Sequence, residues 1–384
     1  MKKLLIIAFM LFCVNNIALA AKGIPIKDFR LFSDIGMSFE HNDNVLQQPT
    51  NEVSSFVTVL TPQVTLERRK RANTYSLTLK PEIGRYFSSS ADNYDDLQLS
   101  ATADWQLSRL AGLTLGGQYQ KEHDERGSTD RLDSTKPFQW HETSVNGLFN
   151  YGRSNAKLRI ELEWDHLIKR YDELFVEDKD QTGIAARFFY RLLPKTRLFF
   201  EAHHTIIDYQ LATSTQDSDL FNYSIGATWF ATKKTTGKAK LGYLTKDFSS
   251  SERDHFSGIS WEAAVQWIPM SRSVINISTR RYPYDATGVG DYLLTQDFSV
   301  VWKHRWKPRI STIMGVHIVD TDFGGNTGSI LRADDTNNLN FLINYHLRKW
   351  LSINMGGHLM KRDSNHDDSD FDRMRWLVVL KVSI

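Results

Sequence analysis

Hydrophobic and polar residues alternate along most of this chain, from residue 30 to the C-terminus. Between residues 97 and 107, every odd position holds Leu, Ala or Trp, and every even position holds Gln, Ser, Thr or Asp. The same alternation occurs in residues 158–165, 221–229 and 373–384. Because successive side chains of a strand point to opposite faces, a period of two predicts β-strands with one apolar and one polar face.

Counting such runs gives about 18 strands, and each is long enough for the nine to eleven tilted residues that cross a bilayer. The alternative count is about 16. After the N-terminus, no segment approaches the roughly 18 consecutive apolar residues of a transmembrane helix. The predicted strands are residues 30–41, 54–68, 74–87, 94–108, 112–123, 138–151, 156–170, 180–193, 197–210, 219–231, 237–248, 256–268, 273–283, 292–304, 310–321, 334–347, 350–362 and 371–384.

The segments that join the predicted strands alternate in length. Short connections, such as residues 109–111 and 193–196, alternate with longer polar ones, such as residues 124–137 and 322–333. Short turns on one side of the membrane and longer loops on the other are typical of outer-membrane barrels. Soluble strands average about five or six residues, roughly half the length seen here, which disfavours a β-sandwich. The sequence therefore predicts an all-β fold, a transmembrane antiparallel outer-membrane β-barrel with both termini in the periplasm.

The N-terminus has the features of a signal peptide. Two lysines precede an apolar run at residues 4–14, and residues 18–20 (Ala-Leu-Ala) form the small-x-small pattern that signal peptidase cuts. The apolar run is too short to span a bilayer as a helix. We expect residues 1–20 to be removed by cleavage between Ala20 and Ala21, and the mature chain to reach the outer membrane of a Gram-negative cell.

No linker, charge block or change of composition interrupts the rest of the chain, which indicates one domain. Residues 21–29 are expected to form a short periplasmic lead, and residues 30–384 the barrel. The only cysteine, Cys13, lies in the signal peptide, so the mature chain contains no thiol. The final amphipathic strand, which ends at Ile384, is the feature that we expect the barrel assembly machinery to bind.

The mature chain is formally neutral. The 47 Lys and Arg residues include Lys2 and Lys3, so 45 remain after cleavage, against 45 Asp and Glu residues. A neutral chain lacks the basic face that a nucleic-acid-binding protein needs. The expected surroundings are outer-membrane lipid and lipopolysaccharide instead.

If the apolar face of each strand contacts lipid, the polar face lines the lumen. Barrels of this circumference enclose an aqueous lumen unless a loop or the N-terminus plugs it. Mixed charges with many amides suit a neutral or weakly charged hydrophilic solute, such as a sugar. The candidate lumen-lining residues are Gln98, Asp104, Gln106, Gln118, Glu122, Glu142, Arg159, Glu161, Glu163, Asp165, Arg187, Glu201, Lys240, Glu262, Arg280, Lys303, His346, Lys361 and Arg375.

The sequence offers no convincing catalytic or metal site. His203 and His204 are adjacent in a strand and should point to opposite faces, so they cannot easily share a site. Residues 363–374 begin like a calcium-binding EF-hand loop, but Asp368 replaces the required glycine and Met374 the closing glutamate. We therefore expect no enzyme activity, no cofactor and no resident metal. A divalent ion bridging this loop to lipopolysaccharide stays open.

Four short motifs in the N-terminal half carry a resemblance to a known family. They are His-Asn-Asp-Asn-Val at 41–45, Leu-Thr-Pro at 60–62, Tyr-Asp-Asp-Leu at 94–97 and His-Asp-Glu-Arg-Gly at 123–127. This succession resembles the type-2 β-barrel porin family, especially the outer-membrane proteins of exopolysaccharide biosynthesis operons. The matching loop residues are Asn42, Asp43, Asn44, His123, Arg126 and Gly127.

The same loop residues also suit ordinary turn chemistry, with Asn-Asp-Asn favouring a turn and Gly127 a positive φ. The resemblance implies export of an exopolysaccharide or capsular polysaccharide, with the polysaccharide and periplasmic export components as partners. A diffusion porin for small hydrophilic solutes and a structural or adhesive surface barrel are the alternatives. No loop much exceeds about fourteen residues, which counts against a porin with a strong constriction.

Overall fold

The structure is a computed structural model that describes residues 23–128, 134–153, 155–232, 234–286, 288, 290–325 and 332–383. The expected signal peptide, its cleavage site at Ala20 and Ala21, and Ile384 lie outside the described residues. None of the helical segments in the described ranges has the length and hydropathy that crossing a membrane requires.

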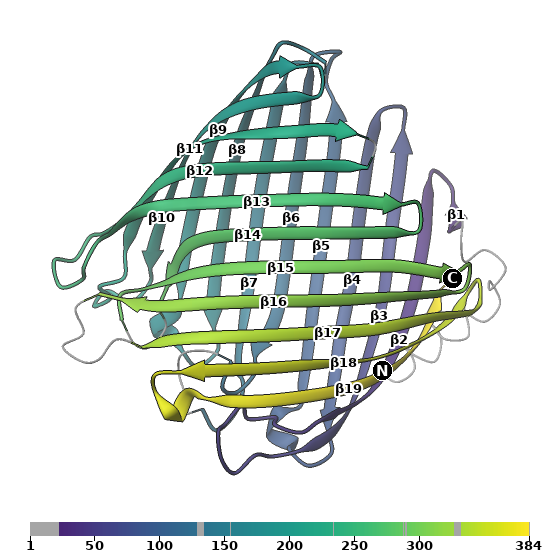
Figure 1. The fold of residues 1–384 in the computed structure, drawn as a ribbon, viewed down its shortest axis with the longest axis vertical. Helices are drawn as coiled ribbons and strands as arrows, with labels where there is room; N and C mark the ends of the chain where they lie inside the picture. Colours follow the sequence, from purple (N-terminus) through teal and green to yellow (C-terminus); the bar gives the residue numbers. More distant parts are fainter. Residues whose placement is uncertain are drawn as a thin grey trace.

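Eighteen long antiparallel strands, β2 to β19, form a closed barrel (Figure 1). Each strand pairs with its neighbours in chain order, and β19 closes the ring by pairing with β2 from Arg375↔Asn42 to Ser383↔Asp34. Closure removes the two free edge strands that an open sheet would have, which is the condition for a sheet to cross a bilayer. The predicted count of about 18 is confirmed.

The observed strands start and end within three residues of the predicted spans. Their bounds are β2 Phe29–Asn42, β3 Ser55–Lys70, β4 Asn73–Tyr86, β5 Tyr94–Gln106, β6 Ala111–Asp124, β7 Phe138–Tyr151, β8 Leu158–Tyr171, β9 Lys179–Leu193, β10 Thr196–Tyr209, β11 Ser218–Thr232, β12 Thr235–Phe248, β13 Phe256–Met270, β14 Ser273–Asp285, β15 Tyr292–Lys307, β16 Ile310–Gly324, β17 Ala333–Arg348, β18 Leu351–Ser364 and β19 Phe371–Ser383.

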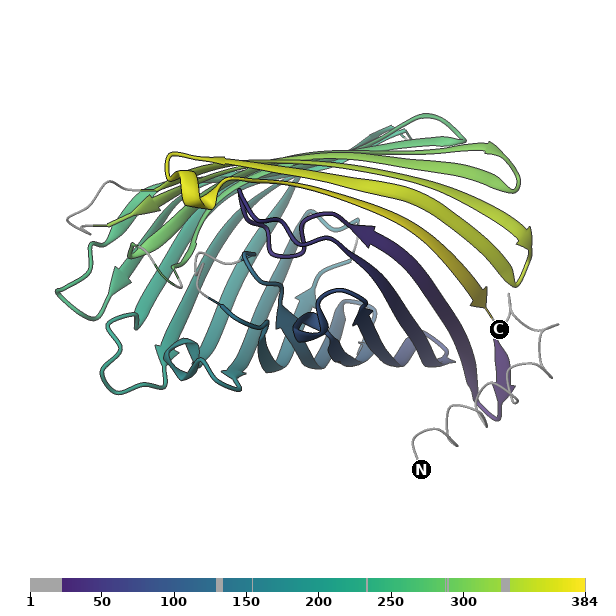
Figure 2. The ribbon, with the colours of Figure 1, turned by 90° about the horizontal axis from the view of Figure 1, so that it is seen from below.

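The two ends of the barrel differ as predicted. Short turns, the start of β2 and the end of β19 lie at one end, and the longer loops lie at the other (Figure 2). We call these the turn end and the loop end. Three single 3-10 turns, η2 (Ser90–Asp92), η3 (Phe175–Glu177) and η4 (Asp367–Ser369), lie in the loops of the loop end.

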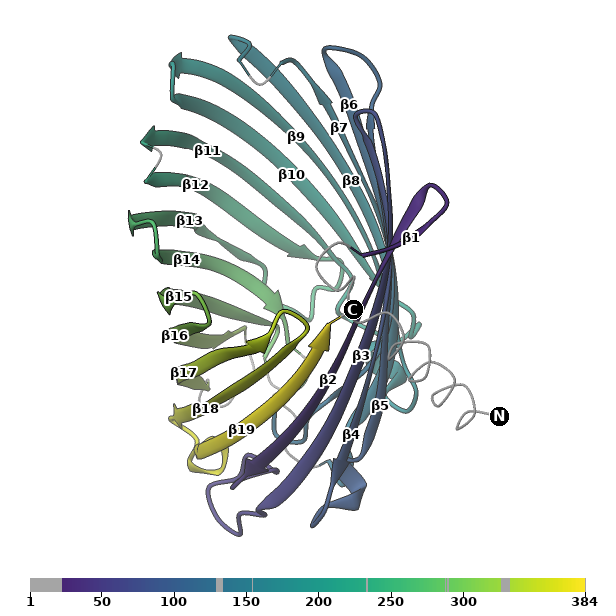
Figure 3. The same ribbon diagram turned by 90° about the vertical axis from the view of Figure 1, so that its right-hand side faces the viewer.

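The residues before the barrel form a small hairpin. Strand β1 (Ile24–Ile26) pairs with the first residues of β2, from Ile24↔Leu31 to Ile26↔Phe29. Figure 3 shows this hairpin projecting from the wall at the turn end. The segment predicted as a lead therefore includes one short strand.

The apolar side chains of the barrel point outward, away from its interior. Leu158 and Ile225 are 67% and 66% exposed, and similar large apolar residues recur at every second position around the ring. The side chains at the alternate positions of each strand point inward and are polar. This arrangement reverses that of a soluble protein and presents a continuous apolar band to lipid.

Candidate functional site

The inner face of the barrel carries the predicted lumen-lining residues, with one exception. On it lie Gln98, Asp104, Gln106, Gln118, Glu122, Glu142, Arg159, Glu161, Glu163, Asp165, Arg187, Glu201, Lys240, Glu262, Arg280, Lys303, His346 and Arg375. His203 and His204 point to opposite faces, as predicted: His203 contacts inner Thr205, and His204 stacks on outer Phe221.

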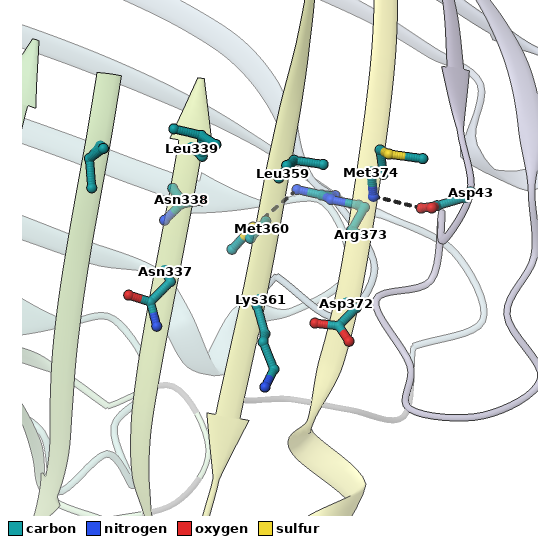
Figure 4. A pocket seen from close by; sticks show the side chains of 11 residues that line it. Asp43, Asn337, Asn338, Leu339, Leu359, Met360, Lys361, Asp372, Arg373 and Met374 are labelled. Atoms are coloured by element: carbon teal, nitrogen blue, oxygen red, sulfur yellow. Dashed lines mark hydrogen bonds between the residues drawn. The ribbon is translucent and has the colours of Figure 1, made fainter. Parts of the chain in front are cut away.

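The assignment of Lys361 to the lumen was wrong. Lys361 shares the outward phase of β18 with Met355 and Leu359, and its ammonium lies 2.8 Å from Asp363. Figure 4 shows it in one row with Asn337 and Asp372 of the flanking strands. The row lies beyond the apolar band, so a lysine is tolerated on the outer face there.

A shallow groove of about 510 Å³ runs along this outer surface, between β16 and β19 (Figure 4). Its apolar lining comes from Val316, Leu339, Leu359 and Met374, and its polar end from residues that include Lys361. The groove faces away from the lumen, so it does not belong to the solute path.

A chain of ion pairs covers one side of the lumen wall. Arg187 of β9 pairs with Glu163 at 2.7 Å and with Glu201, and Lys240 of β12 lies 2.7 Å from Glu201 and 3.2 Å from Glu262. Lys240 reaches Glu201 across β11, where both inner-face residues are small: Ser224 lies opposite Glu201, and Gly226 lies opposite Lys240. Lys238 lies 3.4 Å from Glu262 and completes the chain, which then holds three cations against three carboxylates. Glu201 is only 1% exposed, and paired charges of this kind stiffen the wall without leaving a net charge for a solute.

The first loop of the loop end is fastened to the last strand. Asp43 accepts a hydrogen bond from the backbone N–H of Met374 at 2.7 Å, and the side-chain amide of Asn44 donates to the carbonyl oxygens of Gln48 and Asp372. Asn42 accepts from the N–H of Asn44 at 3.1 Å. Asn44 is completely buried, although it lies in a loop. The Asn-Asp-Asn motif therefore forms the predicted turn and also directs the loop inward (Figure 2).

The loop after β6 meets the first loop inside the mouth. The amide of Gln47 donates to Glu125 and to the carbonyl of Arg126, both at 3.3 Å. Gly127 has the predicted positive φ, at 73°, and a Cβ atom there would lie 2.4 Å from the carbonyl oxygen of Leu46. Only glycine fits this close approach without strain.

Glu125 carries this contact across the barrel opening. Its carboxylate lies 2.7 Å from Arg373 and 3.2 Å from Arg375, both on the inner face of β19, and Arg362 of β18 donates to the carbonyl of Gly127. Four strands lie between β6 and β19, a path of roughly 24 Å along the wall at 4.8 Å per strand spacing. The contact must therefore span the opening as a chord, and we call residues 125–127 the mouth bridge.

The electrostatics of Glu125 reflect this position. Burial alone would raise the pKa of the Glu125 carboxyl, but Arg373 and Arg375 outweigh burial and lower the pKa to about 2. The bridge is consequently fully charged at neutral pH.

The remaining family-like residues hold the mouth bridge to β5 and to the loop between β4 and β5. Arg126 donates from Nε to Asp92 at 2.8 Å and from Nη2 to Ser89 at 3.0 Å. His123 lies 3.0 Å from Asp96 of β5 and stacks on Tyr94 at 4.2 Å. All six residues of the family-like motif thus take part in one assembly at the loop end.

A second element narrows the lumen from the other side. Strand β14 pairs with β13 only as far as Arg281, and its last residues, 282–285, pair with β15 alone. Proline lacks the N–H that a central strand needs, so Pro283 fits a strand that has lost one neighbour. Figure 1 shows the end of β14 turning away from β13. We call residues 282–285 the inturned end.

The inturned end is held against the inner face of β9 to β12. Asp285 forms ion pairs with Lys179 of β9 and Lys246 of β12. Leu220, Leu244 and Phe256 make a small apolar core beneath it, against which Tyr282, Tyr292 and Leu294 pack. A cavity of about 290 Å³ lies between the inturned end and the wall.

The structure narrows the lumen although its loops are short. Two short segments, the mouth bridge and the inturned end, both fold inward, so short loops do not by themselves exclude a narrowing. The key residues of these elements that sequence reasoning missed are Gln47, Glu125, Lys179, Lys246, Asp285, Arg362 and Arg373. Pro283 inside an alternating strand was the signal that could have located the inturned end.

The loop at residues 363–370 does not gather metal ligands. The side chain of Asn365 accepts a hydrogen bond from the backbone N–H of Ala333 at 2.9 Å, and Asp363 pairs with Lys361. Within the described ranges, no group of three or more His, Cys, Asp or Glu side chains could hold a metal ion.

These features define the class: a porin-like outer-membrane β-barrel with a polar, narrowed lumen. The chain belongs to the family described as "Putative beta-barrel porin 2", whose model matches residues 18–384. No match is found among curated proteins.

Solved structures of similar fold come from Pseudomonas aeruginosa. OpdK with vanillate is 10% identical, with 92% of this chain and 99% of that chain covered and a TM-score of 0.53. OccK3 (OpdO) is 13% identical, with 96% and 99% covered and a TM-score of 0.51. OccK5 (OpdH) is 11% identical, with 94% and 99% covered and a TM-score of 0.52. At these identities the likeness concerns the fold.

Proposed function

We propose that this chain is a passive channel through which small hydrophilic solutes diffuse across the outer membrane. The observation that carries the proposal is the polar lumen narrowed by two fixed elements at its loop end. A wall of paired charges, amides and hydroxyls keeps water in the lumen, and the narrowing sets an upper limit on solute size. The barrel fold is shared with OpdK, whose structure was solved with vanillate, and a fold that can hold a small solute supports the proposal.

Export of an exopolysaccharide is the competing proposal, and the fold comparisons give it no support. A polymer in transit would have to pass the mouth bridge, which is held by charge-assisted bonds from Gln47, Arg362, Arg373 and Arg375. An uptake channel needs no such movement. A structural or adhesive barrel would not need a hydrated lumen at all.

Liposome swelling with the purified barrel tests the proposal. Vesicles should swell in arabinose and swell progressively more slowly in disaccharides and trisaccharides, because the two inward elements restrict larger solutes. Glu125→Gln, which removes the ion pairs of the mouth bridge with Arg373 and Arg375, should admit the larger sugars faster. Absence of swelling in every sugar, together with silent planar bilayers at all voltages, would contradict a diffusion channel.

A deletion strain separates uptake from export. Uptake predicts slower entry of small solutes with an unchanged mass of secreted polysaccharide, and export predicts the reverse. We further propose that residues 1–20 direct the chain to the outer membrane. N-terminal sequencing of the mature protein should begin at Ala21, and a different first residue would refute that cleavage site.

A further inference from the structure

We propose that the turn end of the barrel binds the headgroups of anionic phospholipids through a ring of lysine and arginine side chains. The ring consists of the eight turns that join the barrel strands at this end, together with the three residues of each strand from β2 to β19 that lie nearest to it. We call these residues the cationic rim. The inference concerns the contact between the barrel and the membrane, so it does not rest on what passes through the lumen.

Each of the eight turns contains at least one lysine or arginine. The turn residues that the structure describes include no aspartate and no glutamate. Strand ends add further cations, most densely at the end of β3, where Arg68, Arg69 and Lys70 follow one another. In all, the described part of the cationic rim holds 20 lysines and arginines.

Carboxylates do not balance these cations. The one carboxylate within the described part of the rim is Asp104, which accepts a hydrogen bond from Thr114 at 2.7 Å. Four carboxylates outside the rim pair with rim cations, and the pairs are Asp28–Arg68, Asp34–Lys381, Glu67–Arg69 and Glu161–Arg159. Even when these four are counted with Asp104, 20 cations stand against five carboxylates, an excess of 15 positive charges.

The loop end of the barrel has the reverse charge. Its loops and the three nearest residues of each strand hold 30 aspartates and glutamates against 11 lysines and arginines in the described ranges. The whole chain contains 47 basic and 45 acidic residues, so the charges are nearly equal in number but separated along the barrel axis. This separation makes the turn end a surface that attracts an anionic partner.

Exposed apolar side chains alternate with the cations of the rim. Leu107 and Leu110 flank Arg109, and they are 57% and 39% exposed. Leu158, which follows Lys157 directly, is 67% exposed. At the surface of a bilayer, apolar side chains enter the acyl region while neighbouring cations reach the phosphates. The rim therefore fits a phospholipid surface better than it fits an acidic protein in water, which would leave the apolar side chains unpartnered.

Two contacts place rim cations on the outer side of the wall. The Lys157 ammonium lies 5.5 Å from the ring centre of Tyr190, and the Arg68 guanidinium lies 5.4 Å from that of Phe29. Tyr190 is 41% exposed on the outer face of β9. Aromatic rings at this level lie among lipid headgroups, and a cation held against such a ring lies where the phosphates are.

The turns that carry Arg109, Arg153 and Lys157 are adjacent, which makes these cations suitable for a test. The backbone N–H of Gly152 donates to the carbonyl of Leu110 at 2.8 Å and thereby joins the two turns. All three cations are exposed, so they can be replaced without disturbing a packed region.

Spin-label electron paramagnetic resonance of the folded barrel in phosphatidylcholine bilayers tests the inference. Spin-labelled phosphatidylglycerol should associate with the barrel at least about threefold more strongly than spin-labelled phosphatidylcholine, because each cation near a headgroup attracts an anionic lipid. The preference should disappear in about 1 M salt, which shortens the screening length to about 3 Å. Equal association of the two lipids at low salt would overturn the inference.

The variant Arg109→Glu/Arg153→Glu/Lys157→Glu reverses the charge of two of the eight turns. Each reversal removes an attraction and adds a repulsion, so the excess association of phosphatidylglycerol should fall by about half. The matched control is Lys121→Glu/Lys136→Glu/Lys361→Glu, which changes the net charge equally at exposed positions near the loop end and should preserve the preference. An unchanged preference in the turn-end variant, or equal losses in both variants, would overturn the inference.

Poly-L-glutamate distinguishes a lipid surface from a soluble acidic partner. If the barrel in detergent binds poly-L-glutamate but shows no preference for phosphatidylglycerol in bilayers, the rim serves a soluble anion and the inference is overturned. A preference for phosphatidylglycerol that the turn-end variant reduces supports the inference, whether or not the barrel conducts.

Discussion

The carboxylate of Glu125 lies 2.7 Å from the guanidinium of Arg373, although four strands separate β6 from β19 along the wall. Neither residue belongs to an unusually long loop. The contact is possible because Gly127 allows the chain to turn against Leu46 and because Asn44 fixes the first loop to β19. A porin-like barrel can therefore narrow its mouth with three residues rather than with a long inserted loop.

Replacing Glu125 with Gln should open the mouth. The change leaves Arg373 and Arg375 without their carboxylate. It thereby removes the ion pairs that join the loop after β6 to β19. We expect single-channel conductance to rise and the free energy of unfolding to fall by about 1–3 kcal/mol, discounted because Glu125 is partly solvated. Glu67→Gln is the control, because it removes a carboxylate that pairs with Arg69 at the exposed turn end. Equal conductance in the wild type and Glu125→Gln would show that the bridge does not limit the path.

The contribution of the mouth bridge should disappear in acid. The pKa of Glu125 falls from an ordinary value of 4.5 to about 2 in the folded barrel, through Arg373 and Arg375 acting against burial. A lowered pKa means that the stabilisation is complete above the unfolded value and is lost as the pH falls toward the folded value. The difference in melting temperature between the wild type and Glu125→Gln should be constant from pH 7 to 5 and shrink between pH 4.5 and 2. A difference that stays constant to pH 2 would contradict this assignment.

The barrel itself was predictable from the sequence because its signal is repeated. Alternation of apolar and polar residues recurs from strand to strand, and every predicted strand boundary lies within three residues of the observed one. The same pattern predicted which side chains face outward and which face the lumen. The assignment of Lys361 was wrong only because it lies where β18 leaves the apolar band. Past that limit, outward and inward positions are both solvated and polarity no longer distinguishes them.

The narrowing of the lumen was not predictable in the same way. The bond between Glu125 and Arg373 joins residues 248 positions apart, and no local pattern encodes such a contact. Gly127 and the Asn-Asp-Asn motif indicated turns, and both turns are present, but turn chemistry does not say toward which side a loop folds. Pro283 was the one local sign that β14 loses a neighbour, and it does not identify Lys179 and Lys246 as the partners of Asp285.

Replacing Gly127 with Ala should strain the mouth bridge. A methyl group at φ 73° would lie 2.4 Å from the carbonyl oxygen of Leu46, a distance that requires the two loops to separate. We expect a loss of about 1–3 kcal/mol of folding free energy and a wider pore. Gly117→Ala in β6, the strand that precedes this loop, is the control, because the nearest atom to its Cβ lies at 4.0 Å and its φ is ordinary. Heat-modifiability on SDS gels should shift for Gly127→Ala alone, and identical shifts in both variants would refute the steric argument.

Replacing Asp285 with Asn should release the inturned end. Lys246 is only 1% exposed, so removing its carboxylate partner leaves a buried, uncompensated ammonium. Loss of one member of a buried pair costs about 3–5 kcal/mol. We expect a lower melting temperature, a larger conductance and faster entry of trisaccharides. The double variant Asp285→Asn/Lys246→Met should recover part of the stability, because the stranded charge is gone, while the conductance stays high because Lys179 alone cannot hold the end. Full stability in Asp285→Asn, or no recovery in the double variant, would show that the pairing of Asp285 with Lys246 does not fasten the inturned end to the wall.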